Sequence, residues 1–345
     1  MAMLSAQAAR DVTARRRNAV HRRHLLAAAL AAAPLSVSRA QGLQTQGFPA
    51  RPVRIVVGFP PGGGSDLVAR PLAQKMQPVL GQPVLVENRG GANGNLGLAE
   101  VAKSAPDGYT VGHVNNSVIA VNPLLYANLP FDAARDFTPV CTVTAGALFV
   151  MVPADLPARD LRELVALAKA KPGQLNFGSG GAGGVTHLGF ELLRRQTGVE
   201  IVHIPYRGSA PALQDMLGGR IQLMIDGFNL AKAQVDAGRV RAITVFGRER
   251  HPALPDVPTA VEQGFPGLVM PGWQGFIAPA GTPEPVLARL EEAFRGAVAD
   301  PEIQANFMAQ GTLAAFRGRA EMARMIREET ARWAPLIQEL GIRLD

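Results

Sequence analysis

Residues 53–66 read VRIVVGFPPGGGSD, an apolar run that ends in a turn with three successive glycines. The β-branched run Val53–Val57 predicts a strand, and the pattern after it predicts a helix over Ser65–Leu80 with Ser65 as N-cap and Gly81 just past its end. Glycines between a strand and a helix let backbone N–H groups approach an anion at the positive end of the helix dipole. The stretch therefore predicts an α/β fold with an anion cradle.

A second glycine turn, GSGGAGG at residues 178–184, follows the apolar run Leu175–Phe177 and opens a predicted helix over Thr186–Thr197. It provides a second cradle, and two cradles in separate halves of the chain indicate a small carboxylate held between two domains. The turn also matches the dinucleotide fingerprint G-x-G-x-x-G, with Glu200 where a ribose-binding acid would be expected. A nucleotide-dependent α/β enzyme that uses Gly178–Gly183 is therefore the alternative.

The first forty residues predict an export signal that is cleaved after Ala40. Six arginines precede Leu25–Leu35, an apolar run too short to span a bilayer, and Ser38 and Ala40 are small residues at the minus-three and minus-one positions. Arg22 and Arg23 leave twin-arginine export open beside the ordinary secretory route. A periplasmic location is expected, and it counts against an enzyme that needs free NAD(P).

Charge and cysteine content exclude several kinds of partner and cofactor. The chain carries a formal net charge of +7, but residues 1–40 hold seven Arg and one Asp, so the remainder is close to neutral and no nucleic-acid partner is expected. Cys141 is the only cysteine, which excludes an intrachain disulfide and a Cys-based metal site. His187 and Glu191 have helical spacing for two metal ligands, but no third ligand is evident in the sequence, so no metal is predicted.

Short apolar runs alternate with helical patterns along the rest of the chain. The first part reads βαβαβ and predicts a parallel sheet, and a second α/β unit begins near Phe149. The other predicted strands are Pro83–Glu87, Tyr109–Val114, Phe149–Val152, Ile201–Ile204, Ile221–Asp226, Val240–Phe246 and Trp273–Ala278. The other predicted helices are Asn95–Lys103, Asp160–Lys171, Ala210–Leu217, Ala231–Ala237, Glu284–Ala297, Pro301–Met308 and Arg319–Leu340.

Six blocks, in one order, resemble the extracytoplasmic solute receptors of tripartite tricarboxylate transporters, the Bug family. They are Pro52–Asp66, Glu87–Ala92, Ala105–Thr110, Asn122–Tyr126, Ile204–Ser209 and Ala278–Pro283. The resemblance implies an α/β clamshell of the type II periplasmic binding protein class, with mixed sheets flanked by helices. Its first domain would be residues 48–148 plus 275–345 and its second 149–274. It also implies a monomer without catalysis or cofactor, which delivers a small organic carboxylate to the membrane permease subunits.

The resemblance further implies that the ligand lies against residues 58–66 and 178–187. The candidate ligand-binding residues are Phe59, Gly62, Gly63, Gly64, Ser65, Asp66, Asn116, Ser117, Ser179, Gly180, Gly181, Gly183, Gly184, Thr186, His187 and Asp226. Asn116 and Ser117 lie in GHVNNS, residues 112–117, where the family has a Gly-Thr or Gly-Ser pair. Asp66 and Asp226 have structural alternatives, a first-turn acid at a helix dipole and a helix N-cap.

Two further features of the sequence bear on function. Arg207 is a candidate clamp for a carboxylate. Ser179 does not lie in a Gly-x-Ser-x-Gly elbow, because residue 177 is Phe, and no Gly-Lys-Ser/Thr loop occurs. An exported hydrolase is thus an alternative for which the sequence offers no visible triad.

Overall fold

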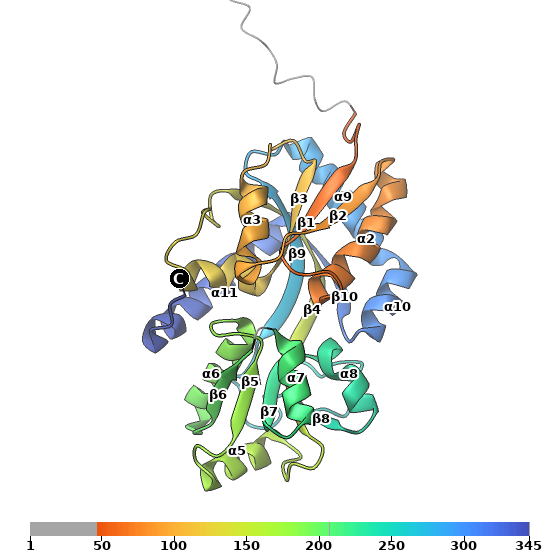
Figure 1. The fold of residues 1–345 in the computed structure, drawn as a ribbon. Coiled ribbons are helices and arrows are strands. Elements are labelled where there is room, and N and C mark those ends of the chain that lie inside the picture. The colour runs from red at the N-terminus through yellow and green to blue at the C-terminus, as the bar shows by residue number, and fades with distance from the viewer. Residues whose placement is uncertain (1–46, 207, 345) are drawn as a thin grey trace, which may run out of the picture. The chain divides into compact units, whose positions relative to one another are not determined.

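The structure is a computed structural model that describes residues 47–206 and 208–344 (Figure 1). The predicted export signal, residues 1–40, and Arg207 lie outside the described residues. None of the helices over the described residues combines the length and the apolar character needed to cross a membrane.

The first part of the chain folds as the predicted βαβαβ unit. Strands β1 (Val53–Val57), β2 (Val84–Asn88) and β3 (Thr110–Asn115) are parallel, in the order β2-β1-β3. Helices α2 (Gly64–Leu80) and α3 (Asn95–Ala102) connect them. Gly81 ends α2 in the left-handed conformation, as predicted, but the N-cap is Gly63, so Ser65 as N-cap was wrong.

The sheet does not remain parallel beyond β3. Strand β9 (Pro271–Pro279) runs antiparallel to β3 and to β4 (Phe137–Pro153), and β10 (Leu313–Gly318) runs antiparallel to β4. Only Phe149–Val152 of β4 was predicted, because register shifts near Pro139 and Thr144 break the alternation in the rest of this strand. We call β1, β2, β3, β9, β10 and residues 137–147 of β4 the first sheet.

The second sheet consists of residues 148–153 of β4 with β5 (Asn176–Ser179), β6 (Val202–Pro205), β7 (Leu223–Gly227) and β8 (Val240–Val245). Helices α5 (Leu161–Ala170), α6 (Val185–Thr197), α7 (Ser209–Leu217) and α8 (Phe228–Asp236) accompany these strands. Asp160 caps α5 through a bond from Glu163 N–H, and Gly198 ends α6 in the left-handed conformation. All four helices were predicted to within a few residues.

Alternate residues of the first sheet contribute to two apolar clusters, one on each face. Ile55, Val57 and Phe276 pack with α2, α9 (Glu284–Ala299) and α10 (Pro301–Ala309). Val56 and Ile277 pack instead with α3, the π-helix η2 (Ser117–Val121) and Met322 of α11 (Arg319–Leu340). The predicted bounds of α11 are confirmed. The short elements η1 (Ala92–Gly94), η2 and α4 (Asn122–Leu125) were not predicted.

The strand directions place the two glycine loops at facing ends of the two sheets (Figure 1). β1 runs in the same direction as β4, because β3 is parallel to β1 and β9 is antiparallel to both β3 and β4. β7 is antiparallel to β4 and parallel to β5, so β5 runs back toward the first sheet. The carboxyl ends of β1 and β5, where α/β folds bind ligands, therefore point toward each other.

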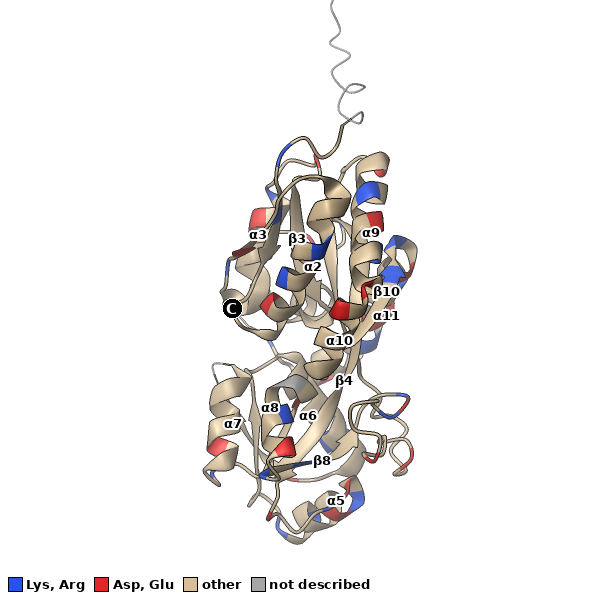
Figure 2. Ribbon diagram, turned by 90° about the vertical axis from the view of Figure 1, so that its right-hand side faces the viewer, with Lys and Arg blue, Asp and Glu red and all other residues tan. Residues whose placement is uncertain are grey.

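Charged side chains of both signs are spread over the helices of both sheets, as Figure 2 shows. Charged side chains of the strands and helices also pair, as in the cluster of Arg54 of β1 with Glu87 of β2 and Glu100 of α3. This mixed distribution agrees with the nearly neutral charge of the chain after residue 40.

Candidate ligand-binding site

The first glycine loop joins β1 to the N-terminus of α2. Gly63 has extended backbone angles and provides no side chain to cap the helix. Gly62 N–H donates to Asp66 Oδ2 at 2.9 Å, and Gly63 N–H donates to Pro60 O at 3.3 Å. The first intrahelical bond runs from Leu67 N–H to Gly63 O. The N–H groups of Gly64, Ser65 and Asp66 thus precede the helical ladder and are the donors of this cradle.

Asp66 braces the first loop from inside. Its side chain is buried and accepts hydrogen bonds from Gly62 N–H, Arg70 Nε at 2.8 Å and Asn88 Nδ2 at 2.9 Å. Asn88 Nδ2 also donates to Phe59 O. Burial acts to raise the pKa of the Asp66 carboxyl, but these hydrogen bonds outweigh it and hold the pKa below its usual value. Both carboxylate oxygens are thus hydrogen-bonded within the protein, Oδ2 to the loop and α2 and Oδ1 to Asn88 at the end of β2.

We expect Asp66→Asn to destabilise the protein by about 2 kcal/mol at neutral pH, because hydrogen bonds to an ionised group contribute more than those to a neutral one. An acid whose pKa is lowered by folding stabilises the fold above its unfolded pKa, and this contribution is lost as the pH falls through the folded pKa. Urea unfolding at neutral and acidic pH should therefore show a difference from wild type that shrinks below about pH 4.

Asp155→Asn is the matched control, because Asp155 is exposed and makes no side-chain hydrogen bond within the described residues. It should unfold like wild type at both pH values. An Asp66→Asn protein as stable as wild type at neutral pH would contradict a bracing role for Asp66.

The second glycine loop joins β5 to the N-terminus of α6, whose N-cap Gly184 is also extended and uncapped by a side chain. Predicted site residues bond the loop itself. Gly180 N–H donates to Thr186 Oγ1 at 3.3 Å, Gly181 N–H to Ser179 Oγ at 3.2 Å, and Gly183 N–H to His187 Nδ1 at 2.9 Å. Leu188 N–H makes the first intrahelical bond, so the N–H groups of residues 185–187 precede the ladder.

Two imidazoles stack beneath this loop. The rings of His187 and His203 lie 4.0 Å apart at 12°, and His203 Nε2 lies 2.6 Å from Ser179 Oγ. Burial, and after it His187, lowers the pKa of His203 to about 4. His203 was missed, because nothing in the sequence shows that β6 brings this side chain under the loop between β5 and α6.

His187 and Glu191, which are spaced like two metal ligands on a helix, contact each other within α6. His187 Nε2 lies 3.5 Å from Glu191 Oε1, and Arg194 Nη2 lies 2.7 Å from Glu191 Oε2. Burial would raise the pKa of the Glu191 carboxyl, but the hydrogen bonds from His187 and Arg194 lower it. The described residues contain no group of three His, Cys, Asp or Glu side chains that could hold a metal.

The remaining predicted residues lie near the ends of strands. Asn116 and Ser117 follow β3 and are buried, and Asn116 Nδ2 donates to Pro271 O at 3.5 Å. The Phe59 ring packs over Gly94, where an added Cβ would lie 3.3 Å from it.

Asp226, at the end of β7, accepts a hydrogen bond from Gly227 N–H, while its buried Oδ2 has no partner among the described residues. Burial raises the pKa of this carboxyl and outweighs the opposite effects of nearby Ser209 and of Gly227 N–H.

The geometry does not suit a dinucleotide site. An added Cβ at Gly178 would lie 2.2 Å from Ile221 Cδ1, so this glycine allows close packing. Glu200 precedes β6 and therefore lies at the amino end of that strand, whereas ligands of open α/β sheets bind beyond the carboxyl ends.

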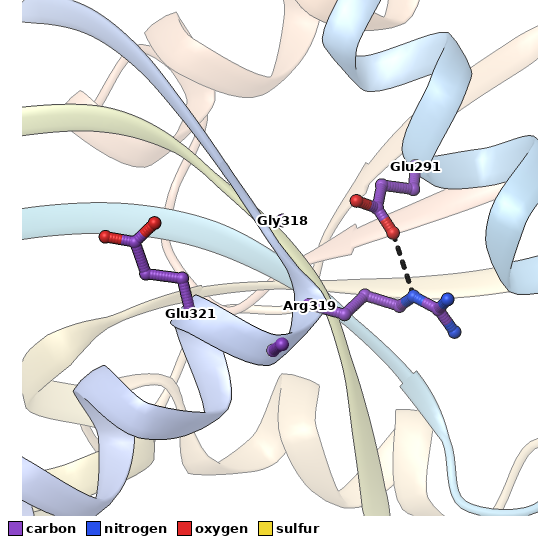
Figure 3. A pocket seen from close by; sticks show the side chains of 5 residues that line it. Glu291, Gly318, Arg319 and Glu321 are labelled. Atoms are coloured by element: carbon purple, nitrogen blue, oxygen red, sulfur yellow. Dashed lines mark hydrogen bonds and ion pairs between the residues drawn. The ribbon is translucent and has the colours of Figure 1, made fainter.

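A surface hollow of about 330 Å³ lies at the start of α11 (Figure 3), and none of its lining residues belongs to either glycine loop. Arg319 is its only basic lining residue, and its guanidinium is paired with Glu291, at 2.8 Å from Nε, and with Glu284. Because this charge is already neutralised by two carboxylates, the hollow offers no free cation for an anionic ligand.

Comparisons with known proteins show the family and the fold. Residues 68–342 match the tripartite tricarboxylate transporter family receptor, TctC. The periplasmic binding protein BugD is 33% identical, with a TM-score of 0.76 over 86% of this chain and 99% of BugD. The adipate-bound Rpa4515 of R. palustris is 33% identical, with a TM-score of 0.79 over 86% of this chain and 99% of that one. MatC from Rhodopseudomonas palustris, with bound malate, is 34% identical, with a TM-score of 0.76 over 84% of this chain and all of MatC, 100%. The chain is a mixed α/β protein of the periplasmic binding type and belongs to the tripartite tricarboxylate transporter receptor family.

Proposed function

We propose that this protein is a periplasmic receptor that binds a small organic carboxylate between the two glycine loops and delivers it to a tripartite permease. The observation that carries the proposal is the pair of uncapped helix N-termini, α2 and α6, at the facing carboxyl ends of β1 and β5. Each offers N–H groups that precede its helical ladder, and a dipole that favours negative charge. Family membership and the adipate and malate in two related structures support the same ligand class.

In this proposal the backbone binds the ligand and the side chains shape the loops. The N–H groups of Gly64, Ser65 and Asp66 bind one end of the carboxylate, with Gly62 and Gly63 in contact beside them, and residues 179–187 contact the other end. Asp226, whose Oδ2 is buried without a partner among the described residues, is available to hydrogen-bond a polar group of the ligand.

We further propose that the receptor is a monomer exported by a signal cleaved after Ala40, and that it is not an enzyme and needs no cofactor. Its domains would be residues 48–148 plus 275–345 and residues 149–274, and they would close on the ligand. N-terminal sequencing of the exported protein tests the signal, since a start at Met1 would contradict it. A radius of gyration that falls on ligand addition would support the closure.

The contact between Ser179 and His203 bears on the hydrolase alternative. A Ser–His pair needs an accessible hydroxyl and a carboxylate that orients the imidazole. Ser179 is 1% exposed, and no carboxylate within the described residues bonds to His203. These features favour a structural role, and turnover of simple esters by the purified protein would contradict it.

A carboxylate panel tests the proposed function. At about 100 times its dissociation constant, a ligand stabilises the native state by ~2.7 kcal/mol, which raises the melting temperature by several degrees for a chain of this size. We expect malate, adipate or another small mono-, di- or tricarboxylate to produce this shift, and its matching amide to produce none. Protein first shown by native mass spectrometry to carry no retained ligand, and then unaffected by the whole panel, would overturn the proposal.

A further inference from the structure

We propose that His187 and His203 are positioning residues that hold the second glycine loop in its binding shape only while His187 is unprotonated at Nδ1. Uptake of a proton there would release the loop and weaken carboxylate binding. The inference rests on the proposed function in one respect, namely that residues 179–187 contact the ligand.

The first step concerns the proton on His187. Gly183 N–H donates to His187 Nδ1 at 2.9 Å, so this nitrogen must present its lone pair and the neutral ring must carry its proton on Nε2. A second proton would go to Nδ1, where it would face the Gly183 N–H. Two donors cannot share a hydrogen bond, so the peptide at Gly183 would have to turn away.

The second step connects the bond between Gly183 and His187 to the rest of the loop. Gly183 has a φ of +74°. Gly181, two residues before it, donates its N–H to Ser179 Oγ, which lies 2.6 Å from His203 Nε2. His203 in turn stacks on His187. Ser179 and His203 thus hold the backbone at Gly181, and His187 holds it at Gly183. Because the two imidazoles stack, a change of charge on His187 alters the backbone at Gly181 as well as at Gly183.

The third step concerns the charged groups that face the pair. Glu191 lies 3.5 Å from His187 Nε2 and is itself paired with Arg194. No other charged side chain within the described residues makes an ion pair or hydrogen bond with either imidazole. Glu191 stabilises a charged His187, whereas burial keeps His203 neutral. The protonation that the loop senses is therefore that of His187 alone.

The test compares two amide variants of His187. His187→Asn places Oδ1 near the position of Nδ1 and accepts from Gly183 N–H at every pH, whereas His187→Gln places its amide near Nε2 and leaves Gly183 N–H without an acceptor. The probes are malate and adipate, measured by calorimetry. Wild-type affinity should fall at least ~10-fold more between about pH 8 and pH 5.5 than that of His187→Asn, and His187→Gln should be weak throughout.

Because the acids themselves bind protons, the His187→Asn protein serves as the reference for their titration. Equal pH profiles for wild type and His187→Asn would overturn the inference. His203→Gln, which keeps an amide near Nε2, should retain wild-type affinity, and His203→Phe, which keeps only the stacking, should lose about 10-fold. Equal affinities of these two variants would count against the role of His203.

A ligand-free measurement separates this inference from the proposed function. In ¹⁵N spectra, His187 Nδ1 should lack a proton at about pH 8, and the Gly181 and Gly183 amide signals should follow the titration of His187. A protonated Nδ1 at that pH, or Gly181 and Gly183 signals that do not shift when His187 is titrated, would contradict the proposed role of His187. Failure of both acids to bind at any pH would instead contradict the proposed function. The spectra would still show whether protonation of His187 releases the loop.

Discussion

Gly63→Asp and Gly184→Asp are each expected to weaken the binding of small carboxylates by about 100-fold or more while the protein stays folded. Both glycines are N-caps with extended backbone angles, at φ −78° and −67°, so an L-residue fits each position. An added Cβ would lie 3.3 Å from Pro60 O at Gly63 and 3.5 Å from Gly181 O at Gly184. Only small adjustments are needed.

An aspartate at these positions has opposite effects on the helix and on the ligand. Its carboxylate accepts from the first N–H groups and complements the helix dipole, which stabilises the helix by a few tenths to about 1 kcal/mol. The same carboxylate occupies the donors that a ligand would use and repels an anion. Two lost charge-assisted bonds, at about 1.5–3 kcal/mol each, account for the loss of affinity.

Isothermal titration with malate or adipate, together with melting curves, measures both effects. Gly296→Asp is the control, because Gly296 lies exposed on α9 with nothing near an added Cβ, so it adds the same charge far from both loops. Its affinity should equal that of wild type. Gly183 is unsuitable, since its φ is +74° and an added Cβ would lie 2.8 Å from Leu344 Cδ1. Full affinity in both aspartate variants would remove the loops from the site.

The elements that the sequence predicts best are the helices whose own sequence contains the residues that begin or end them. α2 and α6 end at glycines in the left-handed conformation, and α5 begins at an aspartate cap, so their bounds are encoded within a few residues. The parts that were missed depend on distant partners. Most of β4 and all of β10 exist because they pair with β9 and β4, and no local pattern reveals that pairing.

The candidate site shows the same division. Both glycine loops could be located, because a glycine turn between a strand and a helix is visible in the sequence. The roles of their side chains could not, since they depend on how each loop folds back on itself. Asp66, Ser179, Thr186 and His187 were predicted as ligand contacts, and each bonds a backbone N–H of its own loop. Whether they also touch a ligand stays a prediction.

The C-terminal helix gives the second large effect. α11 packs Met322 into a cluster of the first sheet, while Trp333, Leu336 and Ile337 pack into the cluster that contains Phe177 of the second. Trp333 is buried, and its Nε1 donates to Glu329 Oε2 at 2.7 Å. The helix therefore contributes side chains to the apolar cores of both sheets, although the predicted domain boundaries assign all of it to the first domain.

We expect Trp333→Ala to destabilise the protein by about 3–5 kcal/mol, because a large buried ring leaves a cavity that its neighbours fill only in part. For a chain of this size the melting temperature should fall by on the order of ten degrees. Trp333→Phe keeps most of the ring but leaves the buried Glu329 carboxyl, whose pKa burial already raises, without its donor, so we expect a loss of only about 1–3 kcal/mol. Differential scanning calorimetry of the three proteins should give that order. If Trp333→Ala melted with wild type, α11 would not be part of the core, and the continuous packing of the two sheets through this helix would be wrong.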